Sequence, residues 1–361
     1  MNSLSLPNSE TQHIYVNMPG HDPCYGTIAE ALEALCPGAR ETGAAGAAAS
    51  PEAKAFPAPE PKIPPAVIHI GKGDYREKLV ITRPNLTLQG EGESRDDVRI
   101  VYGDGATDIM PEGDNRGTFR TASVRVSTCD FTARHLTFEN DAGTGRGQAL
   151  ALYVDGDRNY FFDCALRGHQ DTLFTAPLPE KEMVAGGFKG PGDGKPRTMG
   201  RQCYRGCYID GDVDFIFGSA VAYFENCEIF SRMREGKKPA KPGDRVTCGY
   251  VTAASTPEGA PFGYVFRDCK LASDCPPDSV FLGRPWREYA KTVFLNCELG
   301  AHIRKEGWHD WQKEHGHFYY GEYKSYGPGA SPDTRADFSC QLTDEEAAAY
   351  TAEAILQGWT P

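Results

Sequence analysis

The sequence predicts an all-β protein whose short strands stack as the successive coils of a parallel β-helix. Strand-like runs of three to five residues, separated by Gly, Pro and Asn, continue for more than 200 residues. Helical patterns are absent between these runs, which argues against the strand-helix alternation of a doubly wound sheet. The 40 glycines, 26 prolines and 11% aromatic residues are also typical of a protein made of strands and turns.

A sequence repeat centred on five cysteines supports this fold more specifically. An aromatic residue stands three positions before each cysteine, a turn-prone residue one position before it, and an aliphatic residue two positions after it. Gaps of 43, 20, 42 and 28 residues separate the cysteines, as expected of coils of roughly 20–25 residues that carry loops in some turns. We expect the cysteines to form an inward-facing column of small apolar side chains. The cysteines are Cys164, Cys207, Cys227, Cys269 and Cys297, and the aromatic residues are Phe161, Tyr204, Phe224, Phe266 and Phe294. The turn-prone residues are Asp163, Gly206, Asn226, Asp268 and Asn296, and the aliphatic residues are Leu166, Ile209, Ile229, Leu271 and Leu299.

The N-terminal part of the chain predicts one short helix and one long insertion. Residues 27–36 have a helical apolar pattern with a Thr27/Glu30 capping box, and this helix is expected to cover one end of the strand stack. From residue 38 to residue 65 the composition changes to Ala, Pro, Gly and Glu without periodicity, which is typical of a long surface loop.

The strand pattern resumes at residues 66–70, 79–81 and 86–88 and leads into the repeat. Near the C-terminus a second helix is expected, capped by Thr343 with Glu346 and packed along the outside of the coils. We expect a single domain over residues 1–361. The apolar residues assigned to the second helix are Ala347, Tyr350, Ala354 and Ile355.

Charge and composition exclude several classes of function. The net charge of −12 argues against binding to nucleic acid, and no run approaches the ~20 apolar residues of a membrane-spanning helix. The 12 cysteines include no paired CxxC motif, which makes a zinc site unlikely. Because the N-terminus has no basic start followed by an apolar run, we expect a cytoplasmic protein with reduced thiols, or a secreted one if a signal peptide has been removed.

Two carboxylates stand out because they occur in matched apolar settings. Asp214 lies in the run of residues 211–218 and Asp171 in the run of residues 168–174, and each follows a repeat cysteine by seven positions. The shared offset predicts that the two acids lie on adjacent coils, about 4.8 Å apart. At this distance the two charges repel, so one carboxyl is expected to keep its proton near neutral pH.

Other polar side chains complete the candidate site. Arg284 can keep one carboxylate ionised, and Trp286, two residues later, shares its strand face and can provide a flat floor for a sugar ring. Gln170 directly precedes Asp171, and Gln148 begins a strand one coil earlier. The N–H groups of these amides can stabilise a developing oxyanion.

Four segments together resemble the pectin methylesterase (pectinesterase) family of carbohydrate esterases. They are Gln148-Ala-Leu-Ala-Leu, Gly168-His-Gln-Asp-Thr-Leu-Phe, Gly211-Asp-Val-Asp-Phe-Ile-Phe-Gly and Leu282-Gly-Arg-Pro-Trp, in the order of the family. The resemblance implies a single-stranded, right-handed parallel β-helix that uses no metal or other cofactor. It also implies an enzyme that hydrolyses galacturonate methyl esters, with methylated homogalacturonan or oligogalacturonide as its partner, and we expect a monomer.

The resemblance also assigns roles to the residues at matching positions. Asp214 is implied as the nucleophile and Asp171 as the general acid that later acts as base. Gln148 and Gln170 are implied to stabilise the oxyanion, and Arg284 to hold Asp214.

Trp286, Phe174 and Thr144 are the residues expected to contact the substrate. Two positions depart from the common family pattern. His169 stands where an aromatic residue is frequent, and Asp212 stands where threonine is frequent. We expect Asp212 to be a solvated turn residue rather than a third catalytic acid.

Two alternatives from other functional classes remain open at this point. A polygalacturonate-cleaving glycosidase also uses paired acids, although inverting pairs stand about 6.5–9.5 Å apart, wider than adjacent coils allow. A non-catalytic carbohydrate-binding β-helix needs no matched acids with two glutamines. Methanol release without new reducing ends separates an esterase from both.

Overall fold

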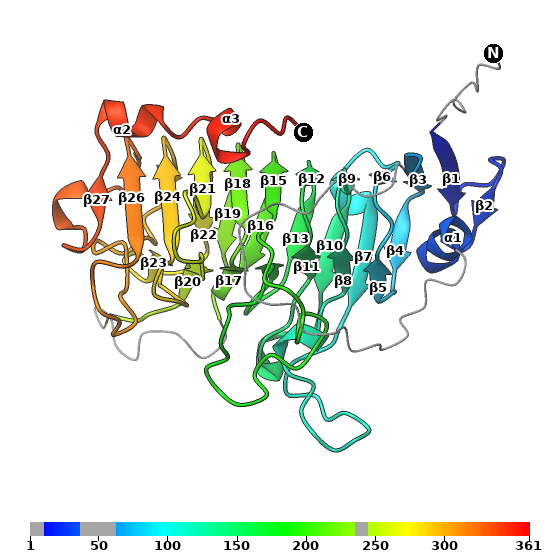
Figure 1. The fold of residues 1–361 in the computed structure, drawn as a ribbon, viewed down its shortest axis with the longest axis horizontal. Coiled ribbons are helices and arrows are strands. Elements are labelled where there is room, and N and C mark those ends of the chain that lie inside the picture. The colour runs from blue at the N-terminus through cyan, green and yellow to red at the C-terminus, as the bar shows by residue number, and fades with distance from the viewer. Residues whose placement is uncertain (1–10, 37–62, 235–244) are drawn as a thin grey trace, which may run out of the picture.

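The computed structural model describes residues 11–36, 63–234 and 245–361. The predicted insertion at residues 38–65 lies almost entirely outside these ranges, and the prediction of one domain over residues 1–361 stays untested. The described strands form three parallel sheets of 12, 8 and 7 strands that run along one stack of coils (Figure 1). This arrangement confirms the predicted parallel β-helix.

The three sheets, called A, B and C, take their strands from successive coils. Sheet A contains β2 (Cys24–Tyr25), β1 (Gln12–Val16), β3 (Ala66–Ile70), β6 (Leu86–Gly90), β9 (Thr132–Arg134), β12 (Asn159–Phe162), β15 (Arg201–Arg205), β18 (Val221–Glu225), β21 (Tyr264–Arg267), β24 (Lys291–Leu295), β26 (Tyr319–Tyr323) and β27 (Cys340–Gln341). Sheet B contains β25 (Glu298–Leu299), β22 (Lys270–Ser273), β19 (Glu228–Ser231), β16 (Tyr208–Gly211), β13 (Ala165–Arg167), β10 (Thr137–Asn140), β7 (Val98–Tyr102) and β4 (Gly73–Tyr75). Sheet C contains β23 (Val280–Gly283), β20 (Gly249–Ala254), β17 (Val213–Gly218), β14 (Leu173–Thr175), β11 (Leu152–Asp155), β8 (Val124–Ser127) and β5 (Leu79–Ile81).

The register of sheet A confirms the cysteine-centred repeat. Phe161 pairs with Tyr204, Tyr204 with Phe224, Phe224 with Phe266, and Phe266 with Phe294. These rings stack inside the coil with centroids 4.4–4.9 Å apart and planes within 7–11° of parallel. The aromatic column is therefore the spine of the core, and the unequal sequence gaps correspond to loops of different length.

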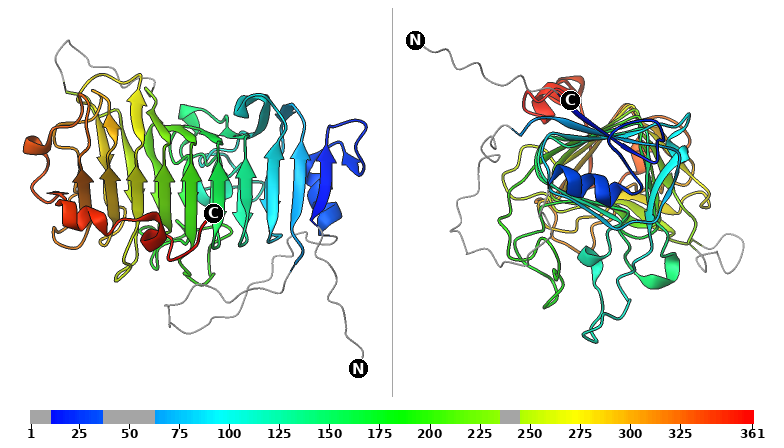
Figure 2. Two further views of the ribbon diagram at one scale, coloured as in Figure 1. Left: turned by 90° about the horizontal axis from the view of Figure 1, so that it is seen from above. Right: turned by 90° about the vertical axis from the view of Figure 1, so that its right-hand side faces the viewer.

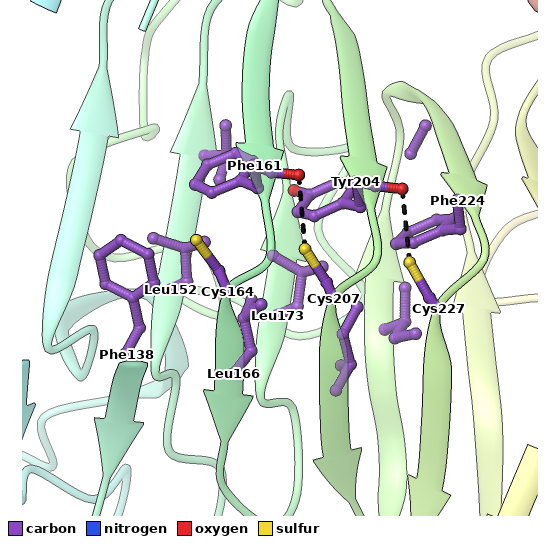
Figure 3. Packing of buried hydrophobic residues seen from close by; sticks show 14 of the residues in the cluster. Phe138, Leu152, Phe161, Cys164, Leu166, Leu173, Tyr204, Cys207, Phe224 and Cys227 are labelled. Carbon is purple, nitrogen blue, oxygen red and sulfur yellow. Dashed lines mark hydrogen bonds between the residues drawn. The ribbon is translucent and has the colours of Figure 1, made fainter. Parts of the chain in front are cut away.

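The cysteine column lies beside the aromatic column, and both are buried (Figure 3). The Cys207 thiol donates to the carbonyl of Phe161 at 3.4 Å, and the Cys227 thiol donates to that of Tyr204 at 3.4 Å. All 12 cysteines are free. The thiols of Cys207, Cys227, Cys269 and Cys297 thus fill small spaces and also satisfy buried carbonyls of the preceding coil, whereas the Cys164 thiol donates to the carbonyl of Phe162 of its own coil.

The backbone conformation explains why a turn-prone residue stands before each cysteine. Asp163, Asn226, Asp268 and Asn296 have φ angles of 50–54°, and Gly206 has 62°. Left-handed backbone is costly for most side chains but accessible to Gly, Asn and Asp, so the turn between sheets A and B selects these residues.

Helices occur at both ends of the stack. Helix α1 (Ile28–Leu35) begins at Thr27, and the capping box with Glu30 is present as predicted. Figure 2 shows α1 lying across the end of the coil, where Ile28 and Ala31 are buried. Four 3-10 turns complete the helical segments: η1 (Arg95–Asp97), η2 (Thr118–Arg120), η3 (Thr144–Arg146) and η4 (Pro332–Thr334).

The prediction of one continuous C-terminal helix was wrong. The segment forms two short helices, α2 (Asp344–Ala348) and α3 (Ala352–Ile355), because Thr351 caps a new helix through the N–H of Ala354. Both lie along the outside of sheet A, as expected (Figure 1). Their buried residues join an apolar cluster with strands β18, β21 and β24.

Candidate active site

The two predicted acids lie on adjacent coils at the start of strands of sheet C. Leu173 of β14 pairs with Ile216 of β17, so Asp171 and Asp214 occupy equivalent positions two residues earlier. The N–H of Asp171 donates to the carbonyl of Val213 at 3.0 Å, which holds the two coils together at this point. The prediction of neighbouring carboxylates from the cysteine offset is therefore confirmed.

Both acids also share an uncommon backbone conformation. The φ angle is 66° at Asp171 and 52° at Asp214, and the register of β17 shifts between Val213 and Ile216. The same left-handed backbone occurs at the turn before each repeat cysteine, and aspartate is one of the few side chains that adopt it readily. The register shift interrupts the regular alternation of side chains along β17 at Asp214.

Arg284 binds Asp214 in a bidentate ion pair. Its Nε donates to Oδ1 at 2.8 Å and its Nη2 donates to Oδ2 at 2.6 Å. Arg284 directly follows β23, and its own N–H donates to the carbonyl of Thr252 at 3.0 Å. This geometry, predicted from the sequence only as a neighbouring charge, is the strong form of a charge-assisted hydrogen bond.

Two aromatic rings enclose the guanidinium of Arg284. Its Cζ lies 3.8 Å from the ring centre of Tyr250 and 3.7 Å from that of Trp311. Neither ring was predicted from the sequence. Tyr250 pairs with Val213 on the neighbouring strand of sheet C. Extending the coil register by one further coil would have predicted its position. Trp311 lies between β25 and β26 and has no periodic signal.

The two carboxyl groups differ in electrostatic environment. Burial, together with the charge of Asp214, raises the pKa of Asp171 well above its ordinary value. Burial also raises the pKa of Asp214, but the hydrogen bonds and charge of Arg284 oppose this shift. Asp171 is therefore the member of the pair that holds a proton more strongly, and Arg284 favours the ionised form of Asp214.

A cleft of about 340 Å³ opens over these groups. Gln148, Gln170 and Trp286 line it together with Asp171, Asp214 and Arg284, as predicted. The loops that follow β7 and β14 leave the stack on the same side and form further walls (Figure 1). The additional lining side chains include Phe119, Met183, Val184, Phe188, Phe217, Arg287 and Trp311.

The expectation that Phe174 contacts substrate was wrong. Phe174 is fully buried and does not line the cleft. Its ring packs against Phe119, Tyr153 and Phe217 with centroids 4.8–4.9 Å apart. Because loop residue Phe119 covers it, Phe174 supports the cleft from beneath.

Thr144 and Asp212 also differ from the simplest expectations. Thr144 begins η3 and is absent from the cleft lining, and its carbonyl accepts a hydrogen bond from Arg234 at 3.3 Å. A substrate contact of Thr144 stays a prediction. Asp212 is buried rather than solvated: its Oδ1 accepts from the N–H of Val213 at 2.7 Å, and its Oδ2 lies 3.3 Å from Nδ1 of His169.

Two further properties concern metals and membranes. Within residues 11–36, 63–234 and 245–361, no group of three or more His, Cys, Asp or Glu side chains is arranged to hold a metal ion. In the same part of the chain, no helix combines the length and apolar character needed to cross a membrane.

Comparison with known proteins identifies the family. The model of the family described as Pectinesterase matches residues 49–178 and 188–359. The pectinesterase/pectinesterase inhibitor PPE8B of Prunus persica is 34% identical over 312 residues, which are 82% of this chain and 52% of that protein. The chain thus spans about half the length of the curated relatives that it matches first.

Solved structures agree with this match. Pectin methylesterase PemA from Erwinia chrysanthemi superposes with a TM-score of 0.71 at 29% identity, covering 98% of both chains. A pectin methylesterase solved in complex with a hexasaccharide gives a TM-score of 0.71 at 30% identity, again over 98% of both chains. The family match covers most of the sequence and includes both acids, both glutamines and Arg284. The chain therefore belongs to the pectinesterase family.

Proposed function

We propose that this protein is a pectin methylesterase, an enzyme that hydrolyses galacturonate methyl esters of pectin or methylated oligogalacturonides to free carboxylates and methanol. The observation that carries the proposal is the unequal acid pair. Asp214 forms two hydrogen bonds to Arg284, whereas burial and the Asp214 charge raise the pKa of Asp171. One site thus offers a nucleophilic carboxylate beside a proton donor.

In the first half of the reaction, a carboxylate oxygen of Asp214 attacks the ester carbonyl carbon. The carbonyl π electrons move to oxygen, and N–H groups of the Gln148 and Gln170 amides stabilise the resulting oxyanion. When the oxyanion collapses, the C–O bond to the methoxy group breaks and Asp171 gives its proton to departing methanol. The product is an anhydride between Asp214 and the galacturonate carboxyl.

In the second half, Asp171 is ionised and can act as a base. It removes a proton from a water molecule, whose oxygen attacks the carbonyl carbon of the anhydride. Collapse of the second tetrahedral intermediate breaks the bond to Asp214 and releases the galacturonate carboxyl group. This collapse leaves Asp171 protonated and Asp214 ionised, as at the start, and the product carboxyl group then loses its own proton to solvent.

The walls of the cleft support a sugar polymer as substrate. Trp286 and Trp311 line the cleft and present flat rings of the kind on which sugar faces pack. The hexasaccharide in the complex of a related pectin methylesterase supports an oligosaccharide ligand. Trp286 is accordingly proposed to bind the sugar next to the reacting ester.

Two measurements on one sample test the proposal. Methylated pectin and short methylated oligogalacturonides are incubated with the protein, and methanol and reducing ends are followed in parallel. Methanol release without new reducing ends supports the esterase. New reducing ends identify the glycosidase alternative, and neither product identifies a non-catalytic carbohydrate-binding protein.

Location and assembly stay predictions of the sequence analysis. Cell fractionation with an antibody to this chain tests the cytoplasmic location against secretion. Light scattering coupled to gel filtration tests the monomer.

A further inference from the structure

Arg234 connects two coils beside Gln170, a residue that lines the cleft. It lies three residues beyond the end of β19. Its Nη1 donates to Oε1 of Gln170 at 3.3 Å, and its Nη2 donates to the carbonyl of Thr144 at 3.3 Å. One guanidinium therefore holds a side chain of the proposed oxyanion site and a loop of an earlier coil at the same time.

The chemistry of the guanidinium decides which atom of Gln170 faces it. An arginine side chain has five N–H donors and no acceptor, so its partner must be the amide oxygen. The amide of Gln170 is planar, and its NH2 group lies on the side opposite to the oxygen. Without a donor-only neighbour, rotation by 180° exchanges oxygen and NH2 with little change in shape.

We propose that Arg234 fixes the orientation of the Gln170 amide, so that the N–H groups and not the oxygen face the reacting ester. This inference rests on the proposed esterase function, because the orientation matters only where Gln170 stabilises an oxyanion. Arg234 is thus a positioning residue that acts through Gln170. A flipped amide presents an acceptor to the developing negative charge and removes one donor from the site.

Substitutions at position 234 distinguish an effect on the orientation of the Gln170 amide from the simple loss of a positive charge. Arg234→Lys keeps a donor-only side chain, so kcat for methanol release should stay within about threefold of the wild-type value. Arg234→Ala removes the bias between the two amide orientations and should lower kcat by about two- to tenfold. Arg234→Glu offers only acceptors, selects the flipped amide, and should lower kcat by about 10²–10³-fold, close to the loss in Gln170→Ala.

The decisive comparison repeats these substitutions in the Gln170→Ala background. The inference predicts that they change kcat there by less than about twofold, because the group that they orient is missing. Losses of the same factor in both backgrounds would assign the effect to charge at the cleft and overturn the inference. Equal kcat values for Arg234→Glu, Arg234→Ala and the wild-type protein would overturn it as well.

Arg245→Ala is the matched control for the loss of charge, and Arg234→Met is the substitute for Arg234→Glu. Arg245 lies in the same connection between β19 and β20 and pairs with Glu306 on the surface, so Arg245→Ala removes a matched charge and should leave kcat unchanged. If Arg234→Glu fails to fold, Arg234→Met replaces it, with a two- to tenfold loss expected in the wild-type background, as for Arg234→Ala, and none in Gln170→Ala. Absence of methanol release by the wild-type protein would contradict the proposed function itself, which is a different result from equal kcat values among active variants.

Discussion

Arg284 binds both carboxylate oxygens of Asp214, at 2.8 and 2.6 Å, while its guanidinium lies between the rings of Tyr250 and Trp311. The two side chains are largely buried, with 15% and 11% of their surfaces exposed. A bidentate pair between flat rings has little freedom to rearrange. The carboxylate is thus held in one place, and Arg284 favours its ionised form, as a nucleophile requires.

Replacing Arg284 by Gln should move the acid limb of the activity profile to higher pH. Arg284 lowers the pKa of Asp214, so its removal raises that pKa, and the ionised nucleophile is then present only at higher pH. Methanol release is measured as kcat against pH. The matched control is Arg205→Gln, which breaks the surface pair with Glu225. An unchanged acid limb in Arg284→Gln would contradict the role assigned to Arg284.

Asp171→Asn should abolish the alkaline limb of the kcat profile and lower kcat by about 10²–10⁴-fold. In the wild-type protein, kcat should fall as pH rises through the raised pKa of Asp171, because the proton donor is then lost. The variant has no titrating group at this position and keeps a flat alkaline profile. A wild-type alkaline limb that survives in Asp171→Asn would assign the acid to another residue.

The same substitution should stabilise the folded protein at neutral and alkaline pH. The pKa of Asp171 is higher in the folded than in the unfolded state, so its favourable contribution is complete below the unfolded pKa, near 3.9, and is lost as pH rises through the folded pKa. Asparagine carries no charge at any pH. The Tm difference between Asp171→Asn and the wild type should therefore grow from pH 4 to pH 8, and a constant difference would contradict the raised pKa.

Phe174 and Trp286 should respond differently to mutation. Phe174→Leu leaves a small cavity beneath the cleft and should lower the free energy of unfolding by about 1 kcal/mol with little change in KM. Trp286→Ala removes a ring that lines the cleft and should raise KM for methylated oligogalacturonides about tenfold. Thermal unfolding and steady-state kinetics on both variants check this. A raised KM in a fully folded Phe174→Leu would restore the original expectation for this residue.

Substitutions of Asn226 test whether left-handed backbone selects the turn-prone residues of the repeat. Its φ of 52° is costly for alanine and free of cost for glycine, which occupies the same column at Gly206. Asn226→Ala should lower the free energy of unfolding by about 1 kcal/mol, and Asn226→Gly should be close to neutral. Denaturant unfolding measures both, and equal values for the two variants would contradict the strain argument.

How far the sequence predicts this molecule depends on whether a feature recurs in each coil. The rings from Phe161 to Phe294 and the seven-residue offset of both acids recur, so coil register and the Asp171–Asp214 pair were predictable. The loops that cover the cleft do not recur from coil to coil. Phe119 and Phe188 come from loops of irregular length, and Phe119 packs on Phe174 while Phe188 packs on Phe119. Phe174 is buried, although its position three residues after Asp171 in the sequence suggests a substrate contact. Trp311 reaches Arg284 from a similar loop.

Methanol release from methylated pectin, measured with the wild-type protein and with Asp214→Asn, shows whether Asp214 is the nucleophile of an esterase site. Asparagine keeps the shape of the side chain but cannot attack as a carboxylate. We expect methanol without new reducing ends from the wild type, and a loss of at least about 10³-fold in kcat for a folded Asp214→Asn. An Asp214→Asn protein that releases methanol at the wild-type rate would rule out Asp214 as the nucleophile.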